Sequence, residues 1–312
     1  MYYGDMRKKP LVSVVIASHR QAMLPGLLHS LLQQNPGPVP FEVIVITDFP
    51  NGQFQNDFAE VQWGYVHERS ISAKRNTAAA LAKAPVLAFI DDDCIAAPDW
   101  VEKGYAYLSE NTAVAAVEGT TTIGTAPGVS RQATREYRRL EKPGYRTNNL
   151  FFRTAVFREI GGFDERFSVQ REDIDLAFTA LEQGYVFGFG SDIRVTHRYR
   201  TGEKWDLLKN CWNRRFDPLL FRKHSGRYMK MVGFPLPPTQ LLLLLLHLFV
   251  LAAFGRRRLI AVAAAVDTTA LSALGLRRSG VHPEKWLYEV LQLAVAPVVT
   301  IAALLYGWVR IR

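Results

Sequence analysis

The segment VLAFIDDDC occupies residues 86–94 and runs five apolar residues directly into three carboxylates. A short continuous apolar run is typical of a strand that is buried on both faces, as in a parallel sheet. Ligands of open α/β sheets bind just beyond the carboxyl ends of such strands. Adjacent acids repel one another, and Mg²⁺ or Mn²⁺ bound by carboxylate and phosphate oxygens would relieve that repulsion. Asp91, Asp92 and Asp93 therefore predict a metal–diphosphate site, with a solvated acidic turn as the alternative.

Strand and helix patterns alternate on the amino-terminal side of this segment. β-Branched and apolar runs predict strands at residues 11–17, 41–46 and 61–66. Apolar residues at helical spacing predict helices at residues 24–34 and 72–83. Ser72 is expected to cap the helix at 72–83. This alternation is typical of a doubly wound α/β sheet. The segment has no P-loop and no Gly-x-Gly-x-x-Gly fingerprint, which argues against an ordinary ATPase or dehydrogenase.

Polar and charged residues follow these strands or open the helix that precedes residue 86. Ser18 lies in the loop after the first predicted strand, and Asp48 follows the second, where it could accept hydrogen bonds from a base or a ribose. Lys74 and Arg75 lie in the first turn of the helix at 72–83, where cations oppose the helix dipole. Contact with a nucleotide or diphosphate would explain them. A turn aspartate and a solvated helix face are the alternatives.

The alternating pattern continues as far as residue 197. Strands are expected at residues 113–122, 148–153 and 185–189, and helices at residues 98–109, 156–160 and 171–183. Residues 125–147 show no clear periodicity, which predicts a mobile loop or a substrate lid. Glu172, Asp173 and Asp175 open the helix at 171–183, and three acids are more than the helix dipole requires.

Several stretches, in the same order along the chain, resemble family 2 glycosyltransferases of the GT-A fold. They are Ser13–Arg20, Glu42–Asp48, Ser72–Asp93 and Asn149–Asp164. The chain departs from the family at residues 17–20, which read Ala-Ser-His-Arg instead of Pro-Thr-Tyr-Asn, and after the second strand, where it keeps one acid instead of two. The resemblance covers roughly residues 10–230. It implies a Rossmann-like α/β domain with a mainly parallel sheet, a nucleotide diphosphate sugar as donor, and transfer with inversion at the anomeric carbon.

The resemblance also implies roles for individual residues. Asp173 would take the proton of the acceptor hydroxyl as general base, with Glu172 beside it as the alternative. Asp91 and Asp93 would flank Mg²⁺ or Mn²⁺, a Lewis acid for the leaving diphosphate, with Asp93 as the direct ligand. His197 would be a third ligand or a structural histidine. The residues implied to bind the nucleotide sugar are Ser18, Asp48, Lys74, Arg75, Asp91 and Asp92.

The composition changes after residue 230. Three apolar segments follow, at residues 231–254, 259–276 and 291–309, and predict membrane helices. Three full spans would place Arg256–Arg258 outside, against the positive-inside tendency. The first two segments could instead form a re-entrant or interfacial hairpin, or the helices could pair between subunits. Asp267 would be costly at membrane depth and could be functional there, whereas an in-plane second helix would make it ordinary.

A basic and aromatic stretch at residues 198–230 connects the two regions, in a chain of net charge +9. Such a stretch suits either nucleic acid or an anionic membrane surface. The apolar segments that follow favour the membrane, so we expect no nucleic-acid partner. Arg214, Arg215 or Arg222 could reach the leaving diphosphate. Two cysteines give no zinc or disulfide spacing, and residues 1–7 lack the apolar core of a signal peptide.

The sequence therefore predicts a GT-A domain at residues 1–230 and a helical membrane region at residues 231–312. Within the first, residues 10–100 would form the nucleotide-binding half, 100–200 the acceptor half, and 200–230 the juxtamembrane stretch. We expect an inner-membrane glycosyltransferase with a cytoplasmic catalytic domain and a lipid-linked or surface-glycan acceptor. The sequence does not determine the oligomeric state, and a homo-oligomer is compatible with it. A nucleotidyltransferase that makes sugar nucleotides and a non-catalytic membrane scaffold are the alternatives. No Gln-x-x-Arg-Trp motif is present, which argues against processive synthesis.

Overall fold

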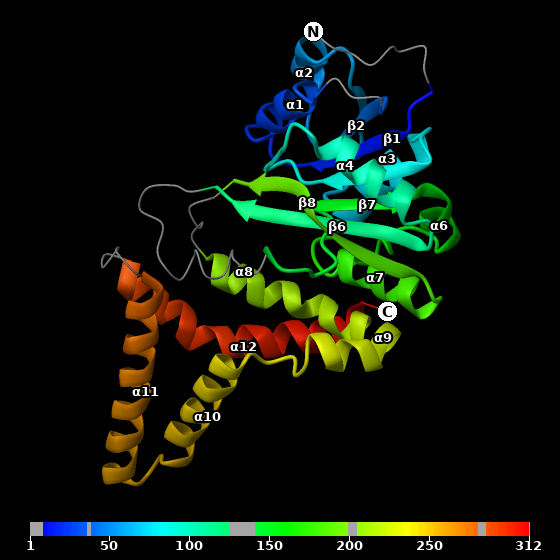
Figure 1. Cartoon of the computed structure of the whole chain (residues 1–312). Coiled ribbons are helices and arrows are strands. Elements are labelled where there is room, and N and C mark those ends of the chain that lie inside the picture. Colours follow the sequence, from blue (N-terminus) through cyan, green and yellow to red (C-terminus); the bar gives the residue numbers. More distant parts are fainter. Residues whose placement is uncertain (1–8, 36–38, 125–140, 199–204, 280–284, 312) are drawn as a thin grey trace. The chain divides into compact units, whose positions relative to one another are not determined.

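A computed structural model of the chain describes residues 9–35, 39–124, 141–198, 205–279 and 285–311 (Figure 1). The chain divides into two compact units that separate near residue 200. The described residues up to 198 belong to the first unit, and those from 205 onward belong to the second. The functional boundary at residue 230 stays a prediction. Residues 1–7, which lack a signal-peptide pattern, and most of the predicted loop at 125–147 lie outside the described residues.

The first unit is built on a mixed sheet of eight described strands in the order β3-β2-β1-β4-β7-β6-β8-β5. The strands are β1 (Val12–Ser18), β2 (Phe41–Thr47), β3 (Gln62–Tyr65), β4 (Val86–Ile90), β5 (Cys94–Ala96), β6 (Val114–Ile123), β7 (Asn149–Arg153) and β8 (Val186–His197). Among the described strands, β1, β2, β3 and β4 pair in parallel, as do β6 and β8. β7 runs antiparallel to β4 and β6, and β5 runs antiparallel to β8. The sheet confirms the predicted α/β class.

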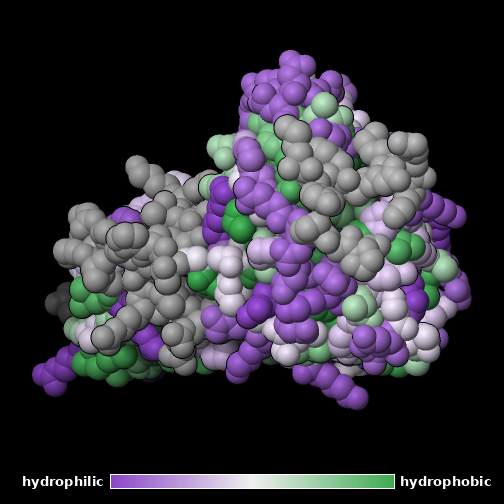
Figure 2. All heavy atoms as spheres, turned by 45° about the horizontal axis from the view of Figure 1, so that its top comes forward, coloured by the Kyte–Doolittle hydropathy of each residue, from purple (hydrophilic) through white to green (hydrophobic). Residues whose placement is uncertain are grey.

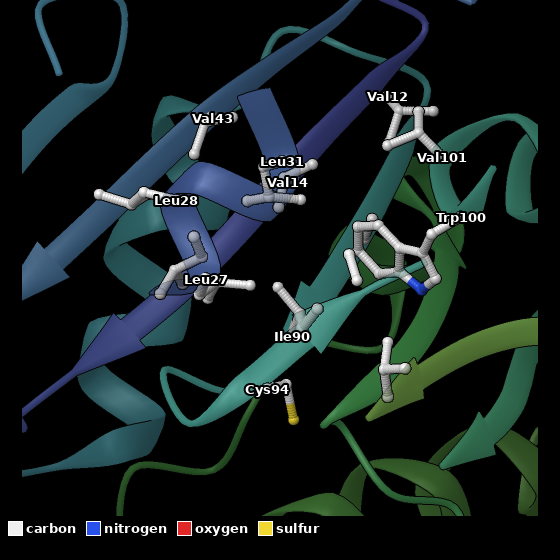
Figure 3. Packing of buried hydrophobic residues seen from close by; sticks show 14 of the residues in the cluster. Val12, Val14, Leu27, Leu28, Leu31, Val43, Ile90, Cys94, Trp100 and Val101 are labelled. Atoms are coloured by element: carbon white, nitrogen blue, oxygen red, sulfur yellow. The ribbon is translucent and has the colours of Figure 1, made fainter. Parts of the chain in front are cut away.

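Helices cover both faces of this sheet (Figure 1). They are α1 (Leu24–Leu32), α2 (Gly52–Asp57), α3 (Ile71–Leu81), α4 (Trp100–Glu110), α6 (Thr154–Glu159) and α7 (Glu172–Glu182). Side chains of α1, α2 and α4 share one buried cluster with alternate residues of β1, β2 and β4, several of which Figure 3 labels. Side chains of α3, α6 and α7 share a second cluster with the intervening residues of the same strands. Because successive residues of a strand face opposite sides, the two clusters lie on opposite faces, and all five residues of β4 are buried.

The predicted cap of the helix at 72–83 was wrong. α3 begins at Ile71, and the Ser70 hydroxyl accepts the hydrogen bond from the Ala73 amide. Ser72 lies inside the helix, and its hydroxyl donates to the Phe167 carbonyl. The helix therefore begins one residue before Ser72, and Lys74 and Arg75 are its fourth and fifth residues, at the junction of the first and second turns.

The second unit is helical over its described residues. Its elements are α8 (Asp206–Asn213), η2 (Arg214–Phe216), α9 (Asp217–Met231), α10 (Pro238–Ala252), α11 (Arg257–Ser279) and α12 (Trp286–Arg310). Among the described helices, α11 and α12 are long and apolar enough to cross a membrane, by length and composition. The first predicted span was wrong in length, because α10 has 15 residues and a helix needs about 20 to cross a bilayer. Prolines at residues 237 and 238 set its late start.

Exposed apolar side chains and a few internal polar contacts characterise these helices. Leu251, Val262 and Leu305 are exposed, and hydrophobic residues reach the molecular surface on the face shown in Figure 2. Asp267 of α11 pairs with His247 of α10 at 3.4 Å between Oδ2 and Nε2. That pairing gives the acid a partner inside the apolar hairpin.

Candidate functional site

The acidic segment that follows β4 lies at the carboxyl ends of the parallel strands. β4, β1 and β2 are neighbours and run parallel, so the residues that follow them meet at one edge. The Lys74 ammonium group joins two of these loops, because Nζ donates to the Ser18 carbonyl at 3.0 Å and pairs with Asp48 Oδ2 at 3.1 Å. Burial lowers the pKa of Lys74, although the Asp48 carboxylate opposes the shift. The structure therefore brings together Ser18, Asp48 and Lys74, and their role in nucleotide binding stays a prediction.

Asp92 is buried and holds the loop that follows β1. Its Oδ2 accepts hydrogen bonds from the Ser18 hydroxyl at 2.9 Å and from the backbone amides of His19 and Arg20 at 3.2 and 3.1 Å. Three donors on one carboxylate oxygen fix the loop against the end of β4. Contact between Asp92 and the nucleotide stays a prediction, whereas its contacts within the protein are structural.

Replacement of Asp92 by alanine is expected to destabilise the first unit. The substitution leaves two backbone amides and one hydroxyl without their acceptor, at a cost of about 3 kcal/mol or more. For a unit of this size we expect the Tm of the full chain in detergent to fall by roughly 5–10 °C. The matched control is Asp57→Ala at the exposed end of α2, which should change the Tm by about 1 °C or less. An equal effect of the two substitutions would contradict the anchoring role.

Arg20 contacts two members of the acidic segment. Its Nη1 donates to Asp92 Oδ1 at 2.9 Å and to Asp93 Oδ2 at 3.0 Å. The sequence did not single out this residue, because the loop is far from the acids along the chain. The departure from the family pattern at residues 17–20 was the only signal that could have drawn attention to it.

Asp93 and His197 lie side by side. His197 ends β8 and is the register partner of Cys94 in β5, so its Nε2 lies 3.3 Å from Asp93 Oδ1. An oxygen and an imidazole nitrogen at this separation fit a divalent ion that takes its remaining ligands from diphosphate and water. Asp91 contacts Arg75 instead, and in the described part of the chain no three His, Cys, Asp or Glu side chains gather as a ligand group. The three-residue ligand set stays a prediction.

Arg75 joins the two acidic motifs of the sequence. Its guanidinium is buried, with Nη2 at 2.8 Å from Asp91 Oδ1 and Nη1 at 2.9 Å from Glu172 Oε1. The charges of Asp91 and Glu172 raise the pKa of Arg75 despite its burial. This arginine therefore stays positively charged between the acids after β4 and those at the start of α7.

Glu172 and Asp173 differ in their surroundings although they are adjacent. Burial, and then the charge of Asp173, raises the pKa of Glu172 to about 7, with Arg75 opposing the shift. Glu172 Oε2 is buried and has no hydrogen-bond partner among the described residues. Asp173 is only half-buried, its Oδ1 accepts from the Ile174 amide at 2.7 Å, and burial raises its pKa as well. The half-buried acid is better placed to meet an incoming hydroxyl, and the buried one is held by Arg75.

The raised pKa of Glu172 predicts how stability depends on pH. The folded protein holds the Glu172 proton up to about pH 7, whereas the ordinary value is 4.5. The stabilisation from this bound proton is complete below about pH 4.5 and is lost as the pH rises through 7. The free energy of unfolding of the wild-type protein therefore decreases across that pH window. Glu172→Gln has no proton to lose, and its stability relative to wild type should increase by about 3 kcal/mol between pH 4.5 and 8. Thermal unfolding at both pH values tests this, with Glu102→Gln on α4 as the control that should show no such trend.

Asn148 was not predicted as a site residue. It is buried, and its Nδ2 donates to the Thr121 hydroxyl at 3.2 Å. Asn149 is the register partner of Ile90, so Asn148 and Asp91 both lie one residue beyond this pair at the same edge. Its Oδ1 is buried without a hydrogen-bond partner in the described chain. The only sequence signal was a polar pair just before an apolar strand.

The sheet order and the acids at its edge define a GT-A fold. A mannosyltransferase from Pyrobaculum calidifontis, solved in complex with GDP-Man and Mn²⁺, shares this fold with a TM-score of 0.54. The alignment covers 97% of this chain and 89% of that one at 15% identity. The likeness at this identity concerns the fold.

The family follows from the sequence comparisons. The family model described as glycosyl transferase family 2 matches residues 13–164. A glucosyl-dolichyl phosphate glucuronosyltransferase of Haloferax volcanii is 27% identical over 235 residues, which cover 64% of this chain and 74% of the relative. A validoxylamine A glucosyltransferase of Streptomyces hygroscopicus subsp. limoneus is 27% identical over 257 residues, or 67% of this chain and 57% of the relative. The chain thus carries a glycosyl transferase family 2 domain at residues 13–164, is a glycosyltransferase, and uses a nucleotide-sugar donor.

Proposed function

We propose that the protein is a membrane-associated, inverting, metal-dependent glycosyltransferase that acts on a lipid-linked acceptor. The observation that carries the proposal is the joining of the two acidic motifs by one buried arginine, since Arg75 contacts both Asp91 and Glu172. A donor-binding acid and an acid beside the acceptor are thereby held in one site. We propose residues 1–230 as the catalytic region and residues 231–312 as the membrane region.

The donor would lie along the carboxyl edge of the sheet. Asp48 would accept hydrogen bonds from the nucleoside, and Lys74 and Arg75 would supply positive charge near the diphosphate. Asn148 Oδ1 and Glu172 Oε2 are buried acceptors without partners in the described chain. Since a buried acceptor is costly to leave unpaired, both would accept hydroxyl groups of the sugar.

The metal site would be held by Asp93 and His197, with Asp91 as an additional ligand in the predicted set. Mg²⁺ or Mn²⁺ bound there would act as a Lewis acid for the leaving diphosphate. The residues of the chain itself bind and orient the donor, and Asp173 would remove the proton of the acceptor hydroxyl as that oxygen attacks the anomeric carbon. Attack from the face opposite the leaving group would invert the configuration at that carbon.

Features of the second unit, taken by itself, support a lipid-linked acceptor. α11 and α12 could cross a membrane, and basic residues of α9 such as Arg222, Lys223 and Arg227 suit an anionic lipid surface. The Haloferax relative is named for a dolichyl phosphate, which supports an isoprenoid phosphate sugar as the acceptor class. We place the catalytic domain on the cytoplasmic side of the inner membrane, where nucleotide sugars are available.

The test is nucleotide release by the full chain in membranes. UDP-, GDP- and dTDP-sugars would be supplied singly, with Mn²⁺ or with EDTA, in the presence of a lipid extract that contains polyisoprenyl phosphate sugars. We expect release from one donor, stimulation by the lipid, and loss with EDTA. Binding of a nucleotide sugar without release under all these conditions would favour the scaffold alternative, and formation of a nucleotide sugar from a sugar phosphate would favour the nucleotidyltransferase.

A further inference from the structure

The loop after β1 places an arginine against the acids of the donor site. Nη1 of Arg20 bridges Asp92 Oδ1 and Asp93 Oδ2 at 2.9 and 3.0 Å. Both carboxylates are almost completely buried, whereas the Arg20 side chain is 29% exposed. The guanidinium therefore lies between buried acids and the open side of the site.

The remaining donors of Arg20 are available to a ligand. An arginine carries five N–H donors in a planar fork, and in the described part of the chain its side chain donates to protein acceptors only through Nη1. Nε and Nη2 remain for an oxyanion, and this fork matches two oxygens of a phosphate. A partly exposed guanidinium that is already held on one side is pre-organised for such a contact.

The loop does not require the guanidinium as an anchor. The Ser18 hydroxyl and the amides of His19 and Arg20 already bind Asp92 Oδ2. These bonds hold the backbone whatever side chain residue 20 carries. The guanidinium of Arg20 is therefore not needed to hold the loop. What it adds is a positive charge between Asp93, which would bind the metal, and Asp92.

We propose that Arg20 is a diphosphate-binding residue that shares Asp93 with the metal. This inference rests on the proposed donor site. Arg20 supplies a resident positive charge, so nucleoside diphosphate binds measurably without any metal. The same charge opposes the cation, because Arg20 and the metal compete for the Asp93 carboxylate and repel one another. Removal of Arg20 therefore acts in opposite directions on the two ligands.

The experiment measures binding of each ligand separately to the full chain in detergent. UDP, GDP and dTDP are titrated by calorimetry in EDTA, and Mn²⁺ is titrated without nucleotide by the electron paramagnetic resonance signal of the free ion. For Arg20→Gln we expect nucleoside diphosphate affinity in EDTA to fall by about tenfold or more. Mn²⁺ affinity should rise severalfold. Arg20→Lys, which keeps the charge but lacks the planar fork, should retain the weaker Mn²⁺ binding of wild type and only part of its nucleotide affinity.

Two outcomes would overturn the inference. If Arg20→Gln weakens both ligands together, Arg20 only supports the loop. If the substitution changes neither the nucleoside diphosphate affinity nor the Mn²⁺ affinity, the guanidinium takes no part in binding either ligand. The control is Arg158→Gln on α6, whose guanidinium donates to the Ala82 carbonyl, and it should leave both affinities unchanged. If wild type binds no nucleoside diphosphate with or without Mn²⁺, the donor site itself fails, and this result is distinct from nucleotide binding that is indifferent to Arg20.

Discussion

Replacement of Asp173 by asparagine is expected to lower kcat by about 10³-fold, within the 10²–10⁴-fold contribution of a general base. A sugar hydroxyl is a poor nucleophile, and asparagine cannot take its proton. Donor binding should be unchanged, because Asp173 is not the acid that contacts Arg75. The measurement combines steady-state transfer to the lipid acceptor with nucleotide affinity of the same preparation.

The neighbouring acid provides the decisive comparison. Glu172→Gln removes a negative charge beside Arg75 but leaves Asp173 able to act, so its kcat should fall less than that of Asp173→Asn. Glu182→Gln, at the exposed end of the same helix, should retain wild-type activity. Burial raises the pKa of Asp173, and a base works only when it is deprotonated, so wild-type activity should decline as the pH falls. Near-normal kcat in Asp173→Asn together with a collapse in Glu172→Gln would assign the base to Glu172 instead.

Local sequence patterns predicted most of the first unit. β1, β2 and β4 are continuous β-branched or apolar runs, and each was found within one residue of its expected bounds. β5 and α2 were missed because elements of three and six residues are too short to show a period. β8 proved longer than predicted, since polar residues alternate along its second half. Register across the sheet, which places Asn148 beside Asp91, depends on pairing between distant strands and leaves no local trace.

Sequence named the residues of the candidate site but not the contacts between them, and their roles stay predictions. Asp48, Lys74, Arg75, Glu172 and the acids after β4 were all named from sequence, and the structure brings them together in ion pairs. Their partners were not predictable, because each contact joins residues that are far apart in the chain. The nucleotide contact of Arg75 stays a prediction, and its position between Asp91 and Glu172 was not foreseen. The bridging position of this arginine can be recognised only when the relative positions of β4, α3 and α7 are known.

Replacement of Asp93 by asparagine is expected to abolish metal-dependent transfer, with a loss of about 10²–10³-fold in kcat/KM, or about 3–4 kcal/mol in the activation free energy. The amide keeps the size of the side chain but loses the charge that would bind the cation beside His197. It also leaves Arg20 with Asp92 alone. Mn²⁺ affinity measured without nucleotide should fall by at least tenfold, in contrast to the increase expected for Arg20→Gln.

The effect of Asp93 can be separated from that of its neighbours by their different contacts. Asp91→Asn, which loosens Arg75 on the exposed side of the site, should weaken Mn²⁺ binding less than Asp93→Asn does. Asp92→Ala should act on stability first, because its oxygens are occupied by the loop after β1. A profile in which Asp91→Asn removes Mn²⁺ binding and Asp93→Asn does not would move the metal toward Asp91 and leave the Asp93–His197 pair as a structural contact. Loss in both variants alike would support a site in which the two acids share the ion, with Arg75 released from Asp91 when the donor binds.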